Sequence, residues 1–415
     1  MRKNIIYIKN NILALIICIL WWFPVTYFGY WTAPVGTDYF RAIKIPFIGL
    51  LFIFIIIKKV NSVNWRVLLF LLIAFIASLD SSDMEYSVVK FLILAVTLSV
   101  FSPLVSSMNA RIIRASIWQN LCWSAVFVAL LSIIWWLANL PVPILYAKEG
   151  FPGITSHAML LGPVAGIGSI FLLSKAFSEN KYWLTTLAIL CYIVSFASAS
   201  RAAIAGTTIG FCLILMVGLN RGKILSLVRL IFPLISIFVF LILVFPEEKL
   251  FFDFLKVDDL RNKGFSHSRK QLWEERMTEF REKPIVGVGI GMSFGYENAL
   301  SKGFGEKFTG TVEPGSAYLV VLSMTGLLGA ISFIILIGYE MLSLRKYWEF
   351  IEFKRKHEII GIGSLLFVHA IAEGWIFSPG NVLCLFFWLW LGIVRDSSDV
   401  VRLNMNHLKT LKIRL

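Results

Sequence analysis

The sequence predicts an all-α fold, a polytopic helical membrane protein with about twelve transmembrane helices and one large periplasmic loop. The first reason is composition, because 58% of the 415 residues are hydrophobic and only 15% are charged, which is far from a soluble globular mixture. The second reason is that apolar runs long enough to cross a bilayer recur along the chain. The third is that one long polar stretch, residues 247–316, interrupts these runs.

The expected membrane helices form two blocks, residues 1–246 and 317–395, on either side of the polar loop. Their centres are expected near residues 21, 50, 72, 97, 129, 166, 190, 210, 236, 330, 367 and 386. The first apolar run, Ile12 to Trp31, lacks a small-residue cleavage site, so we expect a retained helix and not a signal peptide. Residues 396–415 are expected to form a basic cytoplasmic tail.

Lysine and arginine are concentrated in alternate connections between these helices, the pattern that fixes the orientation of helical membrane proteins. The N-terminal segment and the segment around Arg345 are basic, whereas the connection from Asp80 to Tyr86 is acidic. We therefore expect both termini in the cytoplasm, residues 247–316 in the periplasm, and the chain in a bacterial inner (plasma) membrane. The same basic connections explain the net charge of +14, so we expect no nucleic acid partner.

The sequence offers no pattern typical of a cofactor or metal site. All five cysteines lie in apolar segments without metal-ligand spacing, so we expect buried, inert thiols and no metal. The glycines from Gly287 to Gly291 resemble a dinucleotide fingerprint, but they follow a helical pattern where that motif needs a strand. We expect no cofactor and no ATP-driven chemistry.

Within the loop, residues His267 to Pro284 predict an amphipathic helix that ends at the proline. Its apolar positions recur at helical spacing, and its basic residues occupy the other positions: Leu272, Trp273, Met277 and Phe280, against Arg269, Lys270, Arg276 and Arg281. A glycine-rich turn follows, and the next membrane helix is expected to begin at about Ala317. The arginines could bind a diphosphate through bidentate contacts, or could form a solvated face paired with neighbouring glutamates.

Several ionisable residues are expected at helix ends near the outer face. Arg201 lies among small residues at a helix junction, where it could reach into a cavity or simply anchor the interface. His157, His369 and Glu373 are candidate site residues because ionisable groups are costly in a membrane, although each could be hydrogen-bonded structure. Glu313 precedes a helix start, where it could complement the helix dipole or act as a general base.

Taken in order, these residues resemble the O-antigen ligase/polymerase family of bacterial surface-polysaccharide enzymes. The matching pieces run from about residue 150 to 375: Gly153 with His157, the SASRAA segment around Arg201, the loop pair Arg269 and Trp273, the glycines 287–291, the helix opening at Tyr318, and the pair His369 and Glu373.

This resemblance implies a metal-independent glycosyl transfer from an undecaprenyl-diphosphate-linked glycan to a glycan acceptor. By similarity, Arg201 and Arg269 would bind the diphosphate, with Arg276 beside them, and Trp273, Tyr318, His369 and Glu373 would support the site. In ligases of the family a histidine before the tenth helix is the base, but Gly315 holds that position here. Glu313 is the candidate replacement, with His157 or His267 as alternatives.

Three activities stay open. The first is a polymerase of lipid-linked repeat units, which the missing histidine favours. The second is an O-antigen ligase that transfers the glycan to lipid A-core or protein, and the third is a transporter of a lipid-linked anion, which the absence of internal repeats disfavours. The expected partners are the lipid-linked glycan, its acceptor, membrane lipid and a chain-length regulator.

Overall fold

The computed structural model describes residues 2–22, 46–53, 62–138, 150–155, 157–219, 267–292 and 315–413, together with residues 60 and 140. The chain divides into two compact units. Unit 1 comprises Met1–Phe40, Ser116–Phe265 and Glu352–His369, and unit 2 comprises Arg41–Ala115, Ser266–Ile351 and Ala370–Leu415. Each unit therefore combines segments that are far apart in the sequence.

Unit 1 is a bundle of helices. Its elements are α1 (Arg2–Trp22), most of α6 (Met108–Leu137), α7 (Ala158–Glu179), α8 (Tyr182–Ala197), α9 (Arg201–Leu219) and nearly all of α16 (Phe353–Ala372). Small residues let these helices approach closely. A side chain at Gly166 of α7 would collide with Thr207 of α9, and one at Gly206 of α9 would lie 3.0 Å from the backbone of Leu365 in α16.

Unit 2 is built around the helical hairpin of α4 (Trp65–Leu79) and α5 (Met84–Phe101). The other elements are β1 (Ser62–Val63), β2 (Val105–Ser106), the start of α6, α13 (His267–Glu282), α15 (Ala317–Tyr347), the short helix η3 (Trp348–Phe350) and α17 (Val382–Ile413). The antiparallel pair of β1 and β2 joins the start of α4 to the end of α5. Phe70, Phe333 and Trp388 pack together in the core.

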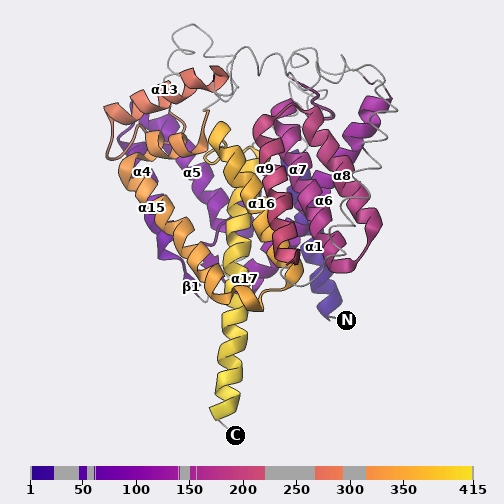
Figure 1. The fold of residues 1–415 in the computed structure, drawn as a ribbon. Helices are drawn as coiled ribbons and strands as arrows, with labels where there is room; N and C mark the ends of the chain where they lie inside the picture. The colour runs from indigo at the N-terminus through magenta and orange to yellow at the C-terminus, as the bar shows by residue number, and fades with distance from the viewer. Residues whose placement is uncertain are drawn as a thin grey trace. The chain divides into compact units, whose positions relative to one another are not determined.

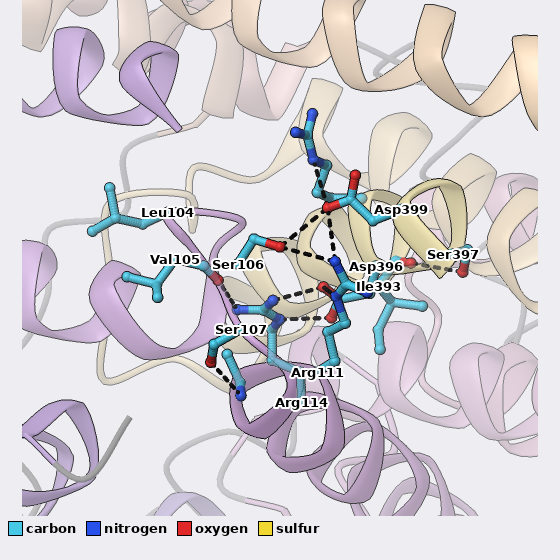
Figure 2. A network of polar contacts seen from close by, with 12 residues as sticks. Leu104, Val105, Ser106, Ser107, Arg111, Arg114, Ile393, Asp396, Ser397 and Asp399 are labelled. Atoms are coloured by element: carbon cyan, nitrogen blue, oxygen red, sulfur yellow. Dashed lines mark hydrogen bonds and ion pairs between the residues drawn. The ribbon is translucent and has the colours of Figure 1, made fainter. Parts of the chain in front are cut away.

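A network of buried ion pairs lies beside the β1–β2 pair of unit 2 (Figure 2). Arg114 makes a bidentate contact with Asp396 of α17 at 2.7 and 2.8 Å, and it also donates to two backbone carbonyls of the segment before α6. Arg111 and Arg395 both contact Asp399, at 3.3 and 3.2 Å. The charges satisfy one another inside the protein, which a buried ion needs.

The described helices agree with the all-α membrane class. By length and composition, four of them can cross a membrane: Met84–Phe101, Met108–Leu137, Ala158–Glu179 and Ala317–Phe350. The expected helix near residue 236 lies outside the described residues, so the total of about twelve stays a prediction, as do the orientation and the periplasmic loop. The described part of the first helix begins earlier than expected, at Arg2.

The expected basic cytoplasmic tail after residue 395 stays a prediction, and the structure shows no break in the helix at that boundary. Helix α17 is continuous from Val382 to Ile413, and Asp396 and Asp399, which were assigned to the tail, are buried in unit 2. The composition of residues 396–415 is polar and basic, which obscured the ion pairs that hold the first of them inside the fold.

Candidate functional site

In unit 1, the N-termini of α7 and α9 lie at the same end. Gly162 of α7 lies against Ser200 and Ala203 around the start of α9, and Gly166 lies against Thr207 further along, so the two helices run in parallel. The N-terminus of a helix carries the positive end of its dipole. Two such termini at one end of the bundle favour a negatively charged ligand there.

Arg201 is the first residue of α9 and is half-exposed at this end. The connection before it is tightly folded, because Ala199 has φ +56° and the backbone N–H of Ser200 donates to Ser198 Oγ. The N–H of Phe151 donates to the carbonyl of Ala197 at 3.1 Å, which ties the segment before α7 to the end of α8. These hydrogen bonds hold the turn before Arg201 in place. The guanidinium of Arg201 adds a positive charge near the two helix N-termini.

His157 is brought to the same end as the N-cap of α7. Its Nδ1 accepts a hydrogen bond from the N–H of Met159 at 3.0 Å. This contact fixes the ring of His157 at the end of the bundle where α9 begins. The role of His157 in the reaction stays a prediction.

In unit 2, α13 packs along the first part of α15, and the two helices run in the same direction (Figure 1). At the start of α15, Gly315 lies against Leu272 and Trp273 of α13. Further along, Gly326 of α15 lies against Ile285, just after α13. Lys283 pairs with Asp80 at 2.9 Å, which fixes the end of α13 at the turn between α4 and α5.

The expectation that Arg276 lies on the polar face of α13 is wrong. Arg276 follows Leu272 by four positions and Trp273 by three, so it shares their face. It is 1% exposed, and it contacts Glu279, which is equally buried, at 2.8 Å. Burial lowers the pKa of the Arg276 guanidinium, and Glu279 opposes this effect. The i, i+3 spacing of the two charges was the sequence signal for this pair.

Gly315 occupies a position that no ordinary side chain fits. Its φ is +77°, in the left-handed region that favours glycine. A Cβ atom at this position would lie 2.9 Å from Cβ of Leu272 and 3.4 Å from Cδ1 of Trp273. A residue with a side chain here would have to push α13 away from α15.

Residues 185–334, a little over a third of the chain, match a family model described as O-antigen ligase. This match supports the resemblance to the O-antigen ligase/polymerase family. The matched segment runs from α8 through α9 and α13 into α15, so it includes both Arg201 and the Gly315 turn. No curated protein matches the chain. The match supports an enzyme of the ligase/polymerase type.

The family resemblance also implies supporting roles for Trp273, Tyr318, His369 and Glu373. Tyr318 lies in the first turn of α15 and is 38% exposed. Trp273 of α13 is half-buried, and its indole N–H has no hydrogen-bond partner among the residues that the structure describes. His369 is 1% exposed near the end of α16, and Glu373 lies just past that helix.

Other family-derived candidates lie outside what the structure describes. Glu313 is one of them, and the side chains of Arg269 and His267 are others, although the backbone of both belongs to α13. Their roles stay predictions. Within the described ranges, no three His, Cys, Asp or Glu side chains gather as metal ligands would.

Proposed function

We propose that this chain is a glycosyltransferase of the O-antigen ligase/polymerase family that polymerises undecaprenyl-diphosphate-linked oligosaccharide repeat units at the periplasmic face, without a metal. A hydroxyl group of the acceptor sugar attacks the anomeric carbon of the donor. The bond from that carbon to the undecaprenyl diphosphate breaks, and the diphosphate keeps the electron pair. A base takes the hydroxyl proton.

The observation that carries the choice of a polymerase over a ligase is the environment of Gly315. Ligases of the family use a histidine at this position as the base. Here φ is +77°, and a Cβ would lie 2.9 Å from Leu272, so a histidine there would strain the backbone and disrupt the contact with α13. The base must come from another residue, and Glu313, two positions earlier in the chain, is our candidate.

Binding of the diphosphate is supported by the end of unit 1 where α7 and α9 begin. Two helix N-termini and the Arg201 guanidinium favour a dianionic group there, and preorganised positive charge stabilises a leaving group that gains negative charge in the transition state. The structural argument concerns Arg201, and the assignment of Arg269 to the diphosphate follows from the family resemblance alone. Because Arg276 is buried against Glu279, we assign it to the stability of α13.

The test is transfer by the purified protein from a synthetic undecaprenyl-diphosphate repeat unit, with EDTA present and ATP absent. We expect Arg201→Ala and Arg269→Ala to abolish product formation and Glu313→Gln to reduce it by at least about a hundredfold, as loss of a general base does. The matched controls are Lys181→Ala, an exposed cation between α7 and α8, and Lys270→Ala, an exposed neighbour of Arg269.

Three results would contradict the proposal. Transfer that needs added lipid A-core or protein as acceptor would indicate a ligase. Movement of the carrier across liposomes without any transfer would indicate a transporter. If the arginine variants were as active as the lysine controls, the assignment of Arg201 and Arg269 to the diphosphate would be wrong.

A further inference from the structure

Helix α15 is broken at Gly326, and the glycine-rich turn after α13 fills the break. In a continuous helix the N–H groups of Leu327 and Leu328 would donate to the carbonyls of Ser323 and Met324. In the structure they donate instead to Pro284 and Ile285, at 2.8 and 3.2 Å. The carbonyls of Ser323 and Met324 accept from the N–H groups of Val288 and Gly289, at 2.9 and 3.1 Å. Two helical hydrogen bonds are thus opened, and the turn supplies a partner to each of the four groups.

Glycine makes this exchange possible on both sides. Gly326 has φ +62° and ψ −168°, a conformation that is essentially restricted to glycine. A Cβ at Gly326 would collide with the backbone of Ile285, and a Cβ at Gly287 would lie 2.5 Å from the backbone nitrogens of Thr325 and Gly326. The two backbones therefore meet without a side chain between them.

The turn is held in the break by neighbouring elements of unit 2. Ser87 of α5 donates to the carbonyl of Ile290 at 3.0 Å, and the N–H of Ile290 donates to Ser78 Oγ of α4 at 3.5 Å. Lys283 contacts the carboxylate of Asp80, at 2.9 Å, and its backbone carbonyl. Each contact is a hydrogen bond or an exposed ion pair of modest net strength.

We propose that α15 is a two-state helix: bent when the turn is docked, and straight when the turn leaves. Unsatisfied backbone groups are costly away from water. Departure of the turn would expose four of them, unless α15 straightens and lets Leu327 and Leu328 donate to Ser323 and Met324 again. Docking of α13 and bending of α15 are therefore one event.

The proposal of two states for α15 is argued from backbone geometry alone. What the two states mean for the active site rests on the proposed function. The turn directly follows α13, which carries Arg269. Release of the turn would withdraw this arginine, and straightening of α15 would separate Gly315 from Leu272. The bent state would then hold the diphosphate, and the straight state would release it as the spent undecaprenyl diphosphate leaves.

The test is amide hydrogen exchange on the full-length protein in lipid nanodiscs. The amides of Val288 and Gly289 are bonded only in the bent state, whereas those of Leu327 and Leu328 are bonded in both states. Alanine favours a continuous helix and rejects the Gly326 conformation, so in Gly326→Ala we expect residues 288–289 to exchange at least about tenfold faster, with 327–328 still protected. Gly287→Ala, which blocks docking from the other side, should give the same pattern.

Gly338→Ala is the matched control, because a Cβ at Gly338 of the same helix meets no atom within 4 Å. It should leave exchange at both segments unchanged. The proposal is overturned if residues 327–328 lose protection together with residues 288–289. That result would mean that α15 unfolds locally around Gly326 and does not straighten. Full protection of residues 288–289 in both glycine variants would also overturn it. The measurement needs no substrate, so its outcome is separate from that of the transfer assay.

Discussion

Arg114 and Asp396 form a bidentate ion pair that joins the start of α6 to α17 inside unit 2 (Figure 2). The guanidinium is 1% exposed, and its remaining N–H group donates to the carbonyls of Ser102 and Val105. The pair thus links α17 to both the end of α5 and the β1–β2 pair. A basic residue between two expected membrane helices is therefore part of the buried interior of unit 2.

Removal of one partner of this pair should destabilise the protein strongly. We expect Arg114→Ala to lower the free energy of unfolding by about 3–5 kcal/mol, because it removes the bidentate partner of the buried Asp396 and leaves only the contact with Arg111 at 3.9 Å. The measurement is thermal or denaturant unfolding in detergent. Arg402→Ala is the control, since Arg402 is 44% exposed and its pair with Asp399 should contribute about 1 kcal/mol or less. Equal losses in the two variants would contradict the buried network.

The buried pair of Arg276 and Glu279 yields a prediction that separates stability from binding. Arg276→Met or Glu279→Leu would each leave one uncompensated buried charge and cost about 3–5 kcal/mol. The double variant should recover most of this loss, because an apolar pair can replace a buried ion pair. We also expect it to retain transfer activity. Restored stability without activity would instead assign Arg276 to the diphosphate site.

Introduction of the family histidine should not create a ligase. We expect Gly315→His to destabilise the protein by at least about 1–3 kcal/mol, because a non-glycine residue at φ +77° is strained and its Cβ crowds Leu272. Transfer to lipid A-core should stay absent, and polymer formation should fall. Both are measured on the same preparation, with Gly338→Ala as control. A stable Gly315→His variant with ligase activity would contradict the claim that this position cannot hold a histidine.

Close packing of α7 against α9 should be required for the position of Arg201. A Cβ at Gly162 would collide with Ser198 Oγ and lie 2.7 Å from Cβ of Ser200. We expect Gly162→Ala to cost roughly 1–3 kcal/mol as overpacking does, and to raise KM for the lipid-linked donor more than it lowers kcat. Steady-state kinetics on the reconstituted enzyme check this. An unchanged KM would mean that Arg201 does not depend on this contact.

The sequence predicted the elements of the candidate site better than their contacts. The helix ending near Pro284 and the start of α15 at Ala317 both follow from local signals, periodicity and a stop residue, and both are confirmed. The burial of Arg276 was not predicted, because the sequence of α13 alone does not show which of its faces packs on α15. The break at Gly326 was missed because an apolar run reads as a continuous helix, and only a partner elsewhere in the chain can satisfy the opened hydrogen bonds.

The most direct measurement of the central claim is the mass of the products formed when the lipid-linked repeat unit is the sole sugar substrate. We expect a ladder of products that differ by one repeat unit, with one undecaprenyl diphosphate released for each new linkage. No product longer than the donor, together with a single transfer once lipid A-core or protein is added, would contradict polymerisation.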